Sequence, residues 1–489
     1  MLEKIKKYDT AIVIGIVACA ILGYTLALNI TAGDEIWNFN NVYKFSRGLV
    51  LYKDINIIIT PLFVWIGSLF LSLLGNNLLA FRINNLVIGV IFFTEMYLLF
   101  KHLFKRKMPA YLAFAVLFTA NRGLIVSGAN YNMLAAIFFL LGVFLLLKAK
   151  ELNWKVSLGQ GILLFCIFLS KQNMAVFYAI GLFFLDLWII KDKKKAILQF
   201  LIQMLTFVIG LGFFFLYLYA NGILEGFFSY AVLGLKEFGQ ENLVGEWNPI
   251  IFIIGLLAVT ITVALACLKN PKIQIKEEVK ENIKKLICFA IPMCFIAFPI
   301  MNQYHIQLGL TLCYILLVYM LYEIILKEFI GKGKLLKVVS IIFTLYLVGS
   351  SFFFTIEWWK MINDSSYPFD KENPFYGGNP VDIREELEEV TAYIENSDKE
   401  VIVFSQDAAL YSIWFGTSHG AMDLPFLGNM GKDGEERMLQ EIASLKDKRI
   451  LIRKDDVHYQ ESQKIREYIQ ENFKQVGTIN KYLIYDTTE

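Results

Sequence analysis

Two adjacent carboxylates stand where the first long apolar run of the chain ends. Asp34 and Glu35 belong to the segment Thr31–Trp37, which follows the run at 10–30. Where a helix leaves a bilayer, paired carboxylates face a partly dry site in which their charges repel each other. A carboxylate in such a site can accept the proton of a hydroxyl group as that group reacts. The alternative is structural, because both acids could begin a helix over Ile36–Phe45, a position that favours acidic residues.

The composition indicates that membrane helices must position these acids. Of the 489 residues, 56% are hydrophobic and only 18% are charged. The apolar residues come in runs of about 20, the span of a bilayer, and this composition excludes a disordered chain, a collagen and a disulfide scaffold. We predict a polytopic α-helical membrane protein with about eleven transmembrane helices. The predicted spans are 10–30, 82–100, 108–121, 131–147, 156–170, 172–190, 196–220, 249–267, 286–302, 304–326 and 338–357.

One further apolar run, Ile58–Gly75, decides which side of the membrane each loop faces. If it lies on the outer surface, six basic clusters face the cytoplasm, and they hold 24 of the 33 Lys and Arg residues before residue 381. If it spans the membrane, the 21 basic residues of the last five clusters move outside. The positive-inside rule favours the first arrangement. We therefore predict an interfacial or re-entrant helix at 58–75, begun by Pro61, within an outer loop at 31–81.

The C-terminal segment differs in charge from the rest of the chain. Residues 381–489 carry 22 acidic and 13 basic residues, whereas the preceding part has a surplus of basic residues. Helical patterns alternate here with strand patterns, which predicts a small α/β domain with a parallel or mixed sheet. We expect two domains, 1–360 in the membrane and 361–489 outside it. An odd number of crossings from a cytoplasmic N-terminus places the second domain on the outer side of the plasma membrane.

The motifs of the first outer loop resemble those of a known enzyme superfamily. The acidic pair is followed by a predicted helix, the pattern Gly48-x-x-x-Tyr52-x-Asp54, the segment Pro61-Leu62-Phe63, and Gly75 with Ala80-Phe81-Arg82. This order is similar to that of the GT-C superfamily of membrane glycosyltransferases, in particular to bacterial relatives of the polyprenyl-phosphate-sugar and dolichyl-phosphate-mannose protein mannosyltransferases. The motif block covers about residues 31–85. At Asn130-Tyr131-Asn132 the sequence departs from the pattern, because many members place a second acid there.

The resemblance implies roles for individual residues. Asp34 would be the general base and Glu35 an assisting carboxylate. The leaving phosphate of the donor needs positive charge, and basic residues at the outer ends of helices stand against the prevailing charge bias. Each of these cations could instead extend to lipid headgroups, and a lone histidine at a helix end could be an ordinary interfacial residue. We assign phosphate binding to Arg82, Arg122, Lys171 and His305, and substrate contacts to Tyr52, Asp54 and Asn132.

The predicted topology indicates the kind of sugar donor. Nucleotide sugars are made in the cytoplasm, whereas every candidate group is predicted to face outward. We therefore predict an inverting glycosyltransferase, transferring a hexose or a pentose from a polyprenyl-phosphate donor to a lipid, glycan or protein acceptor. Two alternatives stay open: a surface-polysaccharide polymerase or ligase, and a lipid-linked-sugar transporter. We predict no cofactor and no nucleic-acid partner, since the sequence has no nucleotide-binding motif or zinc spacing, and a divalent metal stays an open question.

Overall fold

The computed structural model describes residues 9–31, 33–121, 123–126, 128, 130–234, 247–270, 275–297, 303–326, 334–425, 429–455 and 462–488. The chain divides into two compact units, each built from separate stretches. The first contains Met1–Thr25, Asn85–Phe214 and Gly245–Glu357, and the second contains Leu26–Asn84, Phe215–Val244 and Trp358–Glu489. The segment 26–84 thus packs with the C-terminal segment, whereas the sequence analysis separated the two at residue 360. The boundary of the membrane domain stays a prediction.

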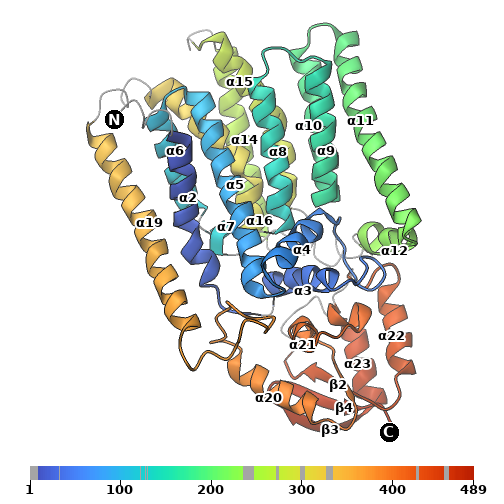
Figure 1. The fold of residues 1–489 in the computed structure, drawn as a ribbon. Coiled ribbons are helices and arrows are strands. Elements are labelled where there is room, and N and C mark those ends of the chain that lie inside the picture. Colours follow the sequence, from blue (N-terminus) through green and yellow to red (C-terminus); the bar gives the residue numbers. More distant parts are fainter. Residues whose placement is uncertain are drawn as a thin grey trace. The chain divides into compact units, whose positions relative to one another are not determined.

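Helices that run side by side make up the first unit (Figure 1). Its elements, each wholly or for most of its length, are α2 (Asp9–Leu26), α5 (Leu78–Phe104), α6 (Lys107–Ala120), α7 (Gly123–Val126), α8 (Tyr131–Lys148), α9 (Trp154–Ser170), α10 (Gln172–Ile189), α11 (Lys193–Ala220), α14 (Trp247–Lys269), α15 (Glu277–Cys294), η2 (Phe295–Ala297), α16 (Gln303–Gly309), α17 (Thr311–Leu321), η3 (Tyr322–Leu326) and α19 (Lys334–Ile362). Each of the eleven predicted runs overlaps one of these helices or the pair α16 and α17, and the end of the run 286–302, at 298–302, lies outside the described residues.

Several of these helices are long and apolar enough to cross a membrane. Among the described residues there are 5 such helices, or up to 6 if α16 and α17, which meet at a bend of 48°, count as one span. The five are Leu78–Phe104, Tyr131–Lys148, Gln172–Ile189, Lys193–Ala220 and Ser340–Ile362. Shorter apolar helices lie at Thr10–Leu26, Leu62–Leu74, Lys107–Ala120, Trp154–Ser170 and Ile253–Lys269. The number of eleven crossings therefore stays a prediction.

A glycine and two polar side chains fix the packing of α8, α9 and α10. A Cβ atom added to Gly142 of α8 would stand 1.8 Å from the hydroxyl of Tyr178 on α10, so only glycine fits there. The Tyr178 hydroxyl donates to Gln160 of α9, and Gln160 Nε2 donates to the Gly142 carbonyl at 3.2 Å. Small residues with interhelical hydrogen bonds hold helices together in apolar surroundings, where burial of apolar area contributes little.

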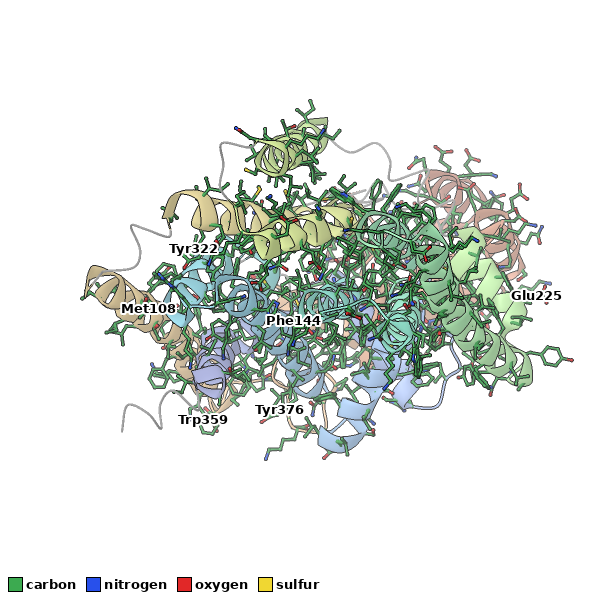
Figure 2. All side chains as sticks on the ribbon, turned by 90° about the horizontal axis from the view of Figure 1, so that it is seen from above. Met108, Phe144, Glu225, Tyr322, Trp359 and Tyr376 are labelled. Atoms are coloured by element: carbon green, nitrogen blue, oxygen red, sulfur yellow. The ribbon has the colours of Figure 1, made fainter. Side chains whose placement is uncertain are left out.

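Aromatic side chains fill much of the remaining space in the first unit. Figure 2 looks along its helices, and the labelled Phe144 and Tyr322 lie among them. Tyr322 stacks on Phe104 of α5 with ring centroids 4.2 Å apart, and Phe144 of α8 meets His102 edge to face at 6.0 Å. Such pairs stabilise packing beyond the area that they bury.

Two helices of the second unit come from the predicted outer loop. They are α3 (Asp34–Ser46) and α4 (Leu62–Leu74). Pro61 precedes α4, as predicted, and Gly75 ends it with a φ of 114° that favours glycine. The 13 residues of α4 extend only about 20 Å, less than the roughly 30 Å of a bilayer core. Leu69, Leu73 and Leu74 are exposed on it, which fits a helix that lies at an interface.

The C-terminal part of the second unit is a mixed four-stranded sheet with helices. Strand order is β1-β2-β4-β3; β1 and β2 are parallel, and the other neighbours are antiparallel. Side chains of both sheet and helices form the core, including Ile402, Ile450 and Ile469. The elements are α20 (Arg384–Glu395), β1 (Glu400–Val403), α21 (Ala408–Phe415), η4 (Gly420–Asp423), α22 (Gly434–Ser444), β2 (Lys448–Arg453), α23 (Gln463–Asn472), β3 (Lys474–Ile479) and β4 (Tyr482–Asp486); α12 (Leu224–Phe227) and η1 (Phe228–Gly234) also belong to this unit.

Acid should weaken the end of β4. Burial acts to raise the pKa of Asp486, but hydrogen bonds from Lys399 and Thr488 lower it to about 2. The folded pKa is thus below the ordinary value of about 3.9, so this carboxylate stabilises the fold fully above pH ~4, and its contribution is lost as the pH falls toward 2. Thermal unfolding of the full chain between pH 5 and pH 2 should show this loss, and Asp486→Asn should make the pH dependence shallower. An unchanged pH dependence in the variant would contradict the assignment.

Candidate functional site

The two acids of the first outer loop have different surroundings. Asp34 and Glu35 occupy the first turn of α3, which follows Gly33 and has no side-chain cap. Asp34 is exposed, and its backbone carbonyl accepts a hydrogen bond of 2.7 Å from Asn38 Nδ2. Glu35 is partly buried. Asp34 thus lies at the surface of its unit, the dry site stays a prediction, and the helix begins two residues earlier than Ile36.

Arg82 holds Glu35 through both of its carboxylate oxygens. The Arg82 Nε donates to Glu35 Oε1 at 3.0 Å, and Nη2 donates to Oε2 at 2.8 Å. Its Nη1 donates to the carbonyls of Leu26 and Gly377 at 2.9 and 3.4 Å. The Arg82 side chain is completely buried, while that of Glu35 is 12% exposed. These four bonds engage the guanidinium on all three nitrogens. We assign to Arg82 the positioning of Glu35, and its assignment to the donor phosphate stays a prediction.

The turn that contacts Arg82 also closes the start of α5. The first N–H groups of a helix have no partner within the helix. Here the N–H groups of Leu78 and Leu79 donate to the carbonyls of Pro374 and Tyr376 at 2.8 and 3.0 Å. Residues 374–377 therefore fix the N-terminal end of α5, and with it Arg82.

Tyr52 and Asp54 serve the internal structure of their loop. Tyr52 is 3% exposed, and its hydroxyl donates to the Ile59 carbonyl at 2.8 Å. Its φ of 65° lies in the left-handed region, which is uncommon for a residue with a side chain. Asp54 Oδ2 accepts from the Val50 N–H at 2.8 Å. Their polar groups stabilise the turn, and the substrate contacts assigned to these two residues stay predictions.

In the first unit the structure brings Asn132 and His305 together. Asn132 Nδ2 and His305 Nε2 are 3.2 Å apart, and both residues are buried. Next to them, Tyr304 donates through its hydroxyl to Asn130 Oδ1 at 3.0 Å, and the same oxygen accepts from the Asn132 N–H at 2.9 Å. Asn132 Oδ1 is buried without a hydrogen-bond partner in the described part of the chain. It is therefore an acceptor available to a hydroxyl of a ligand.

Lys171 is the single residue between α9 and α10. It is 8% exposed, and its Nζ donates to the Ile296 carbonyl at 2.9 Å. Within the described ranges no carboxylate lies at ion-pair distance from it. A buried charge without an opposite charge is costly, so this position is suited to an anionic ligand. Lys171 also acts electrostatically on His305.

Loss of the Lys171 charge should weaken binding of a phosphate donor. A hydrogen bond to a charged group contributes about 1.5–3 kcal/mol, which corresponds to a KM for the donor roughly 10- to 100-fold higher in Lys171→Met. Lys171→Arg keeps the charge and should keep most of the affinity, and Lys155→Met, at the exposed start of α9, is the matched control. Donor titration in a transfer assay measures these values. An unchanged KM in Lys171→Met would exclude a phosphate contact.

Two further points from the sequence analysis concern Arg122 and a divalent metal. Arg122 lies outside the described residues. No group of three or more His, Cys, Asp or Glu side chains in the described part of the chain could hold a metal ion.

The structure adds an ion pair that the sequence analysis missed. Lys44 of α3 pairs with Asp423, and their side chains are 5% and 3% exposed. Burial lowers the pKa of Lys44, and the Asp423 carboxylate only partly opposes this. Burial acts to raise the pKa of Asp423, but hydrogen bonds from His419 and Lys44 bring it below its ordinary value. The sequence contains one indication of this pair. Ile36, Asn40 and Lys44 are spaced four apart, so they share one face of α3, and all three are buried.

Comparisons with known proteins bear on the family and on the fold. Residues 59–230 match the family model of dolichyl-phosphate-mannose-protein mannosyltransferase. The structure is similar to that of ArnT from Cupriavidus metallidurans bound to undecaprenyl phosphate, with a TM-score of 0.55, 10% identity, and coverage of 97% of this chain and 98% of that one. An Archaeoglobus fulgidus oligosaccharyltransferase in complex with Zn and sulfate matches with a TM-score of 0.40 and 12% identity, over 82% of this chain and 61% of that one.

A search of curated protein sequences found no match. The similarity to ArnT, at 10% identity, shows a common fold. The resemblance seen in the sequence is confirmed: the chain shares the fold of ArnT, and its residues 59–230 match the dolichyl-phosphate-mannose-protein mannosyltransferase family.

Proposed function

We propose that the protein is an inverting glycosyltransferase that moves one sugar from a polyprenyl-phosphate donor to an acceptor at the outer face of the plasma membrane. The observation that carries the proposal is the N-terminal turn of α3. Arg82 locks Glu35 there through two hydrogen bonds, while the neighbouring Asp34 is exposed. A fixed helix start with one accessible carboxylate suits a general base, which must be held at a set place beside its substrate.

The reaction assigned to Asp34 is a single displacement. The acceptor hydroxyl loses its proton to the Asp34 carboxylate and its oxygen forms a bond to the anomeric carbon of the donor sugar. The bond between that carbon and the phosphate oxygen breaks, and the polyprenyl phosphate leaves with the electron pair. The attack comes from the face opposite the leaving group, so the anomeric configuration inverts. Lys171 stabilises the anionic phosphate, and Asn132 and His305 supply hydrogen bonds to it or to the sugar.

Two lines of similarity support the lipid-linked donor. The matched family is named for transfer from dolichyl-phosphate-mannose, and the ArnT structure holds undecaprenyl phosphate. The N-terminus is proposed to be cytoplasmic, with the C-terminal domain outside, because this orientation keeps all six basic clusters inside. No cofactor is proposed, so activity should persist in EDTA.

The test uses purified full-length protein in detergent with a radiolabelled polyprenyl-phosphate sugar. Transfer releases unglycosylated polyprenyl phosphate, which chromatography separates from the donor. A transporter would leave the donor intact, and a polymerase or ligase would require a diphosphate-linked oligosaccharide instead. Because the acceptor is not known, membrane lipid extract, glycan and peptide fractions are supplied separately. Failure to release lipid phosphate with donors of several sugars and all three fractions would overturn the proposal.

A further inference from the structure

A cavity lies in the C-terminal part of the second unit, against α21, β1 and η4. Its volume is about 350 Å³, near the lower end of the roughly 300–1,000 Å³ found for small-molecule sites. One part of its wall is apolar, with Val401, Val403, Ala408 and Phe415. This size fits a small ligand.

The polar part of the wall carries balanced charges. Lys399 Nζ donates to both carboxylate oxygens of Asp486 at 2.8 Å. His419 lies between two acids, with its Nε2 3.5 Å from Glu400 Oε1 and its Nδ1 3.5 Å from Asp423 Oδ1. Each cation of the wall thus has a carboxylate neighbour, and no surplus positive charge is left to bind a phosphate. The wall instead offers donors and acceptors beside an aromatic ring, which suits an uncharged ligand rich in hydroxyl groups.

Two residues of this wall also hold α3. Ser412 donates through Oγ to Asn40 Oδ1 at 3.1 Å. Asp423 forms the buried ion pair with Lys44 and accepts from the His419 N–H at 2.8 Å. Asn40 and Lys44 lie one turn apart on α3, the helix that begins with Asp34. A ligand that contacts Ser412 or Asp423 therefore touches the residues that hold this helix.

We propose that this cavity binds one uncharged sugar residue and that it does so on the wall that fixes α3. The inference rests on the proposed function, in which α3 carries the general base. Binding of the sugar can nevertheless be measured without any transfer. The sugar can belong to the acceptor or to the donor, and the two sources share the same chemistry.

The first experiment measures binding by saturation-transfer NMR on the detergent-solubilised full-length protein. The probes are methyl α-mannoside, N-acetylglucosamine and methyl β-galactoside, with inorganic phosphate as a charged competitor. At least one sugar should receive saturation, and phosphate should not displace it. Thr417→Trp, which places a ring at an exposed position of the wall, should remove the signal, whereas Thr478→Trp on the exposed strand β3 should not. The proposal is overturned if no sugar binds, if phosphate competes, or if Thr417→Trp leaves the signal unchanged.

A second measurement separates the sources and keeps the two proposals distinct. Displacement of the free sugar by a short-chain polyprenyl-phosphate mannose assigns the cavity to the donor sugar, and lack of displacement assigns it to the acceptor sugar. If sugars bind but no lipid phosphate is ever released, the proposed function is wrong, while the proposal that the cavity binds a sugar is supported. If transfer occurs but no sugar binds at this wall, the cavity proposal fails alone.

Discussion

Replacing Asp34 by asparagine should abolish sugar transfer without unfolding the protein. The variant keeps the shape of the side chain but cannot take a proton, and a general base contributes typically about 10²- to 10⁴-fold to the rate. The loss should appear in kcat, because the missing proton transfer belongs to the transition state. Stability should change little, since Asp34 is exposed and asparagine keeps the shape of its side chain. The measurements are the rate of lipid-phosphate release and the thermal midpoint of the purified variant.

The neighbouring acid provides a sharp comparison. Glu35→Gln removes the charge that pairs with the buried Arg82, so this variant should lose stability as well as activity. Asp455→Asn, at an exposed position of the same unit, is the matched control and should change neither. If Asp34→Asn retained full kcat, Asp34 would not be the base, whatever the effect of Glu35→Gln.

Much of the helical part of the fold could be predicted because bilayer-length apolar runs depend on local composition alone. The positive-inside rule singled out 58–75 as different, and the helix found there is too short to cross. The break between α16 and α17 was missed, since 304–326 reads as one continuous apolar run. In the C-terminal part of the second unit, the alternating pattern predicts strands at 401–405, 450–453 and 482–485, which overlap β1, β2 and β4. Strand β3 was missed because its Lys474–Ile479 sequence is polar and largely exposed.

The partners of the site residues could not be predicted, because they are set by tertiary contacts. Arg82 stood in a motif and carried a positive charge, so a phosphate contact was a reasonable assignment. Its real partners include the carbonyl groups of Leu26 and Gly377, and a backbone carbonyl leaves no trace in the sequence. Asn132 and His305 were each selected, yet only the structure shows that they touch across 173 residues of chain.

The buried pair of Arg82 and Glu35 leads to the largest expected effect on stability. Arg82→Met leaves Glu35 without its partner and removes the donors to two carbonyls, and breaking a buried pair in this way costs about 3–5 kcal/mol. Arg82→Lys should also lose much of this stability, because an ammonium group cannot reproduce the planar two-bond contact of a guanidinium. The thermal midpoint of the detergent-solubilised full chain measures both variants.

Arg384→Met is the matched control for Arg82→Met, because it makes the same substitution at an ion pair that differs in burial. Arg384 pairs with Glu388 four residues along α20, and their side chains are 49% and 62% exposed. Water and salt screen such a pair, so its loss should cost no more than about 0.5 kcal/mol. A midpoint for Arg82→Met as high as that for Arg384→Met would show that the start of α3 does not depend on the buried guanidinium. In that case Glu35 would have to be held by other groups, and the positioning role assigned to Arg82 would be wrong.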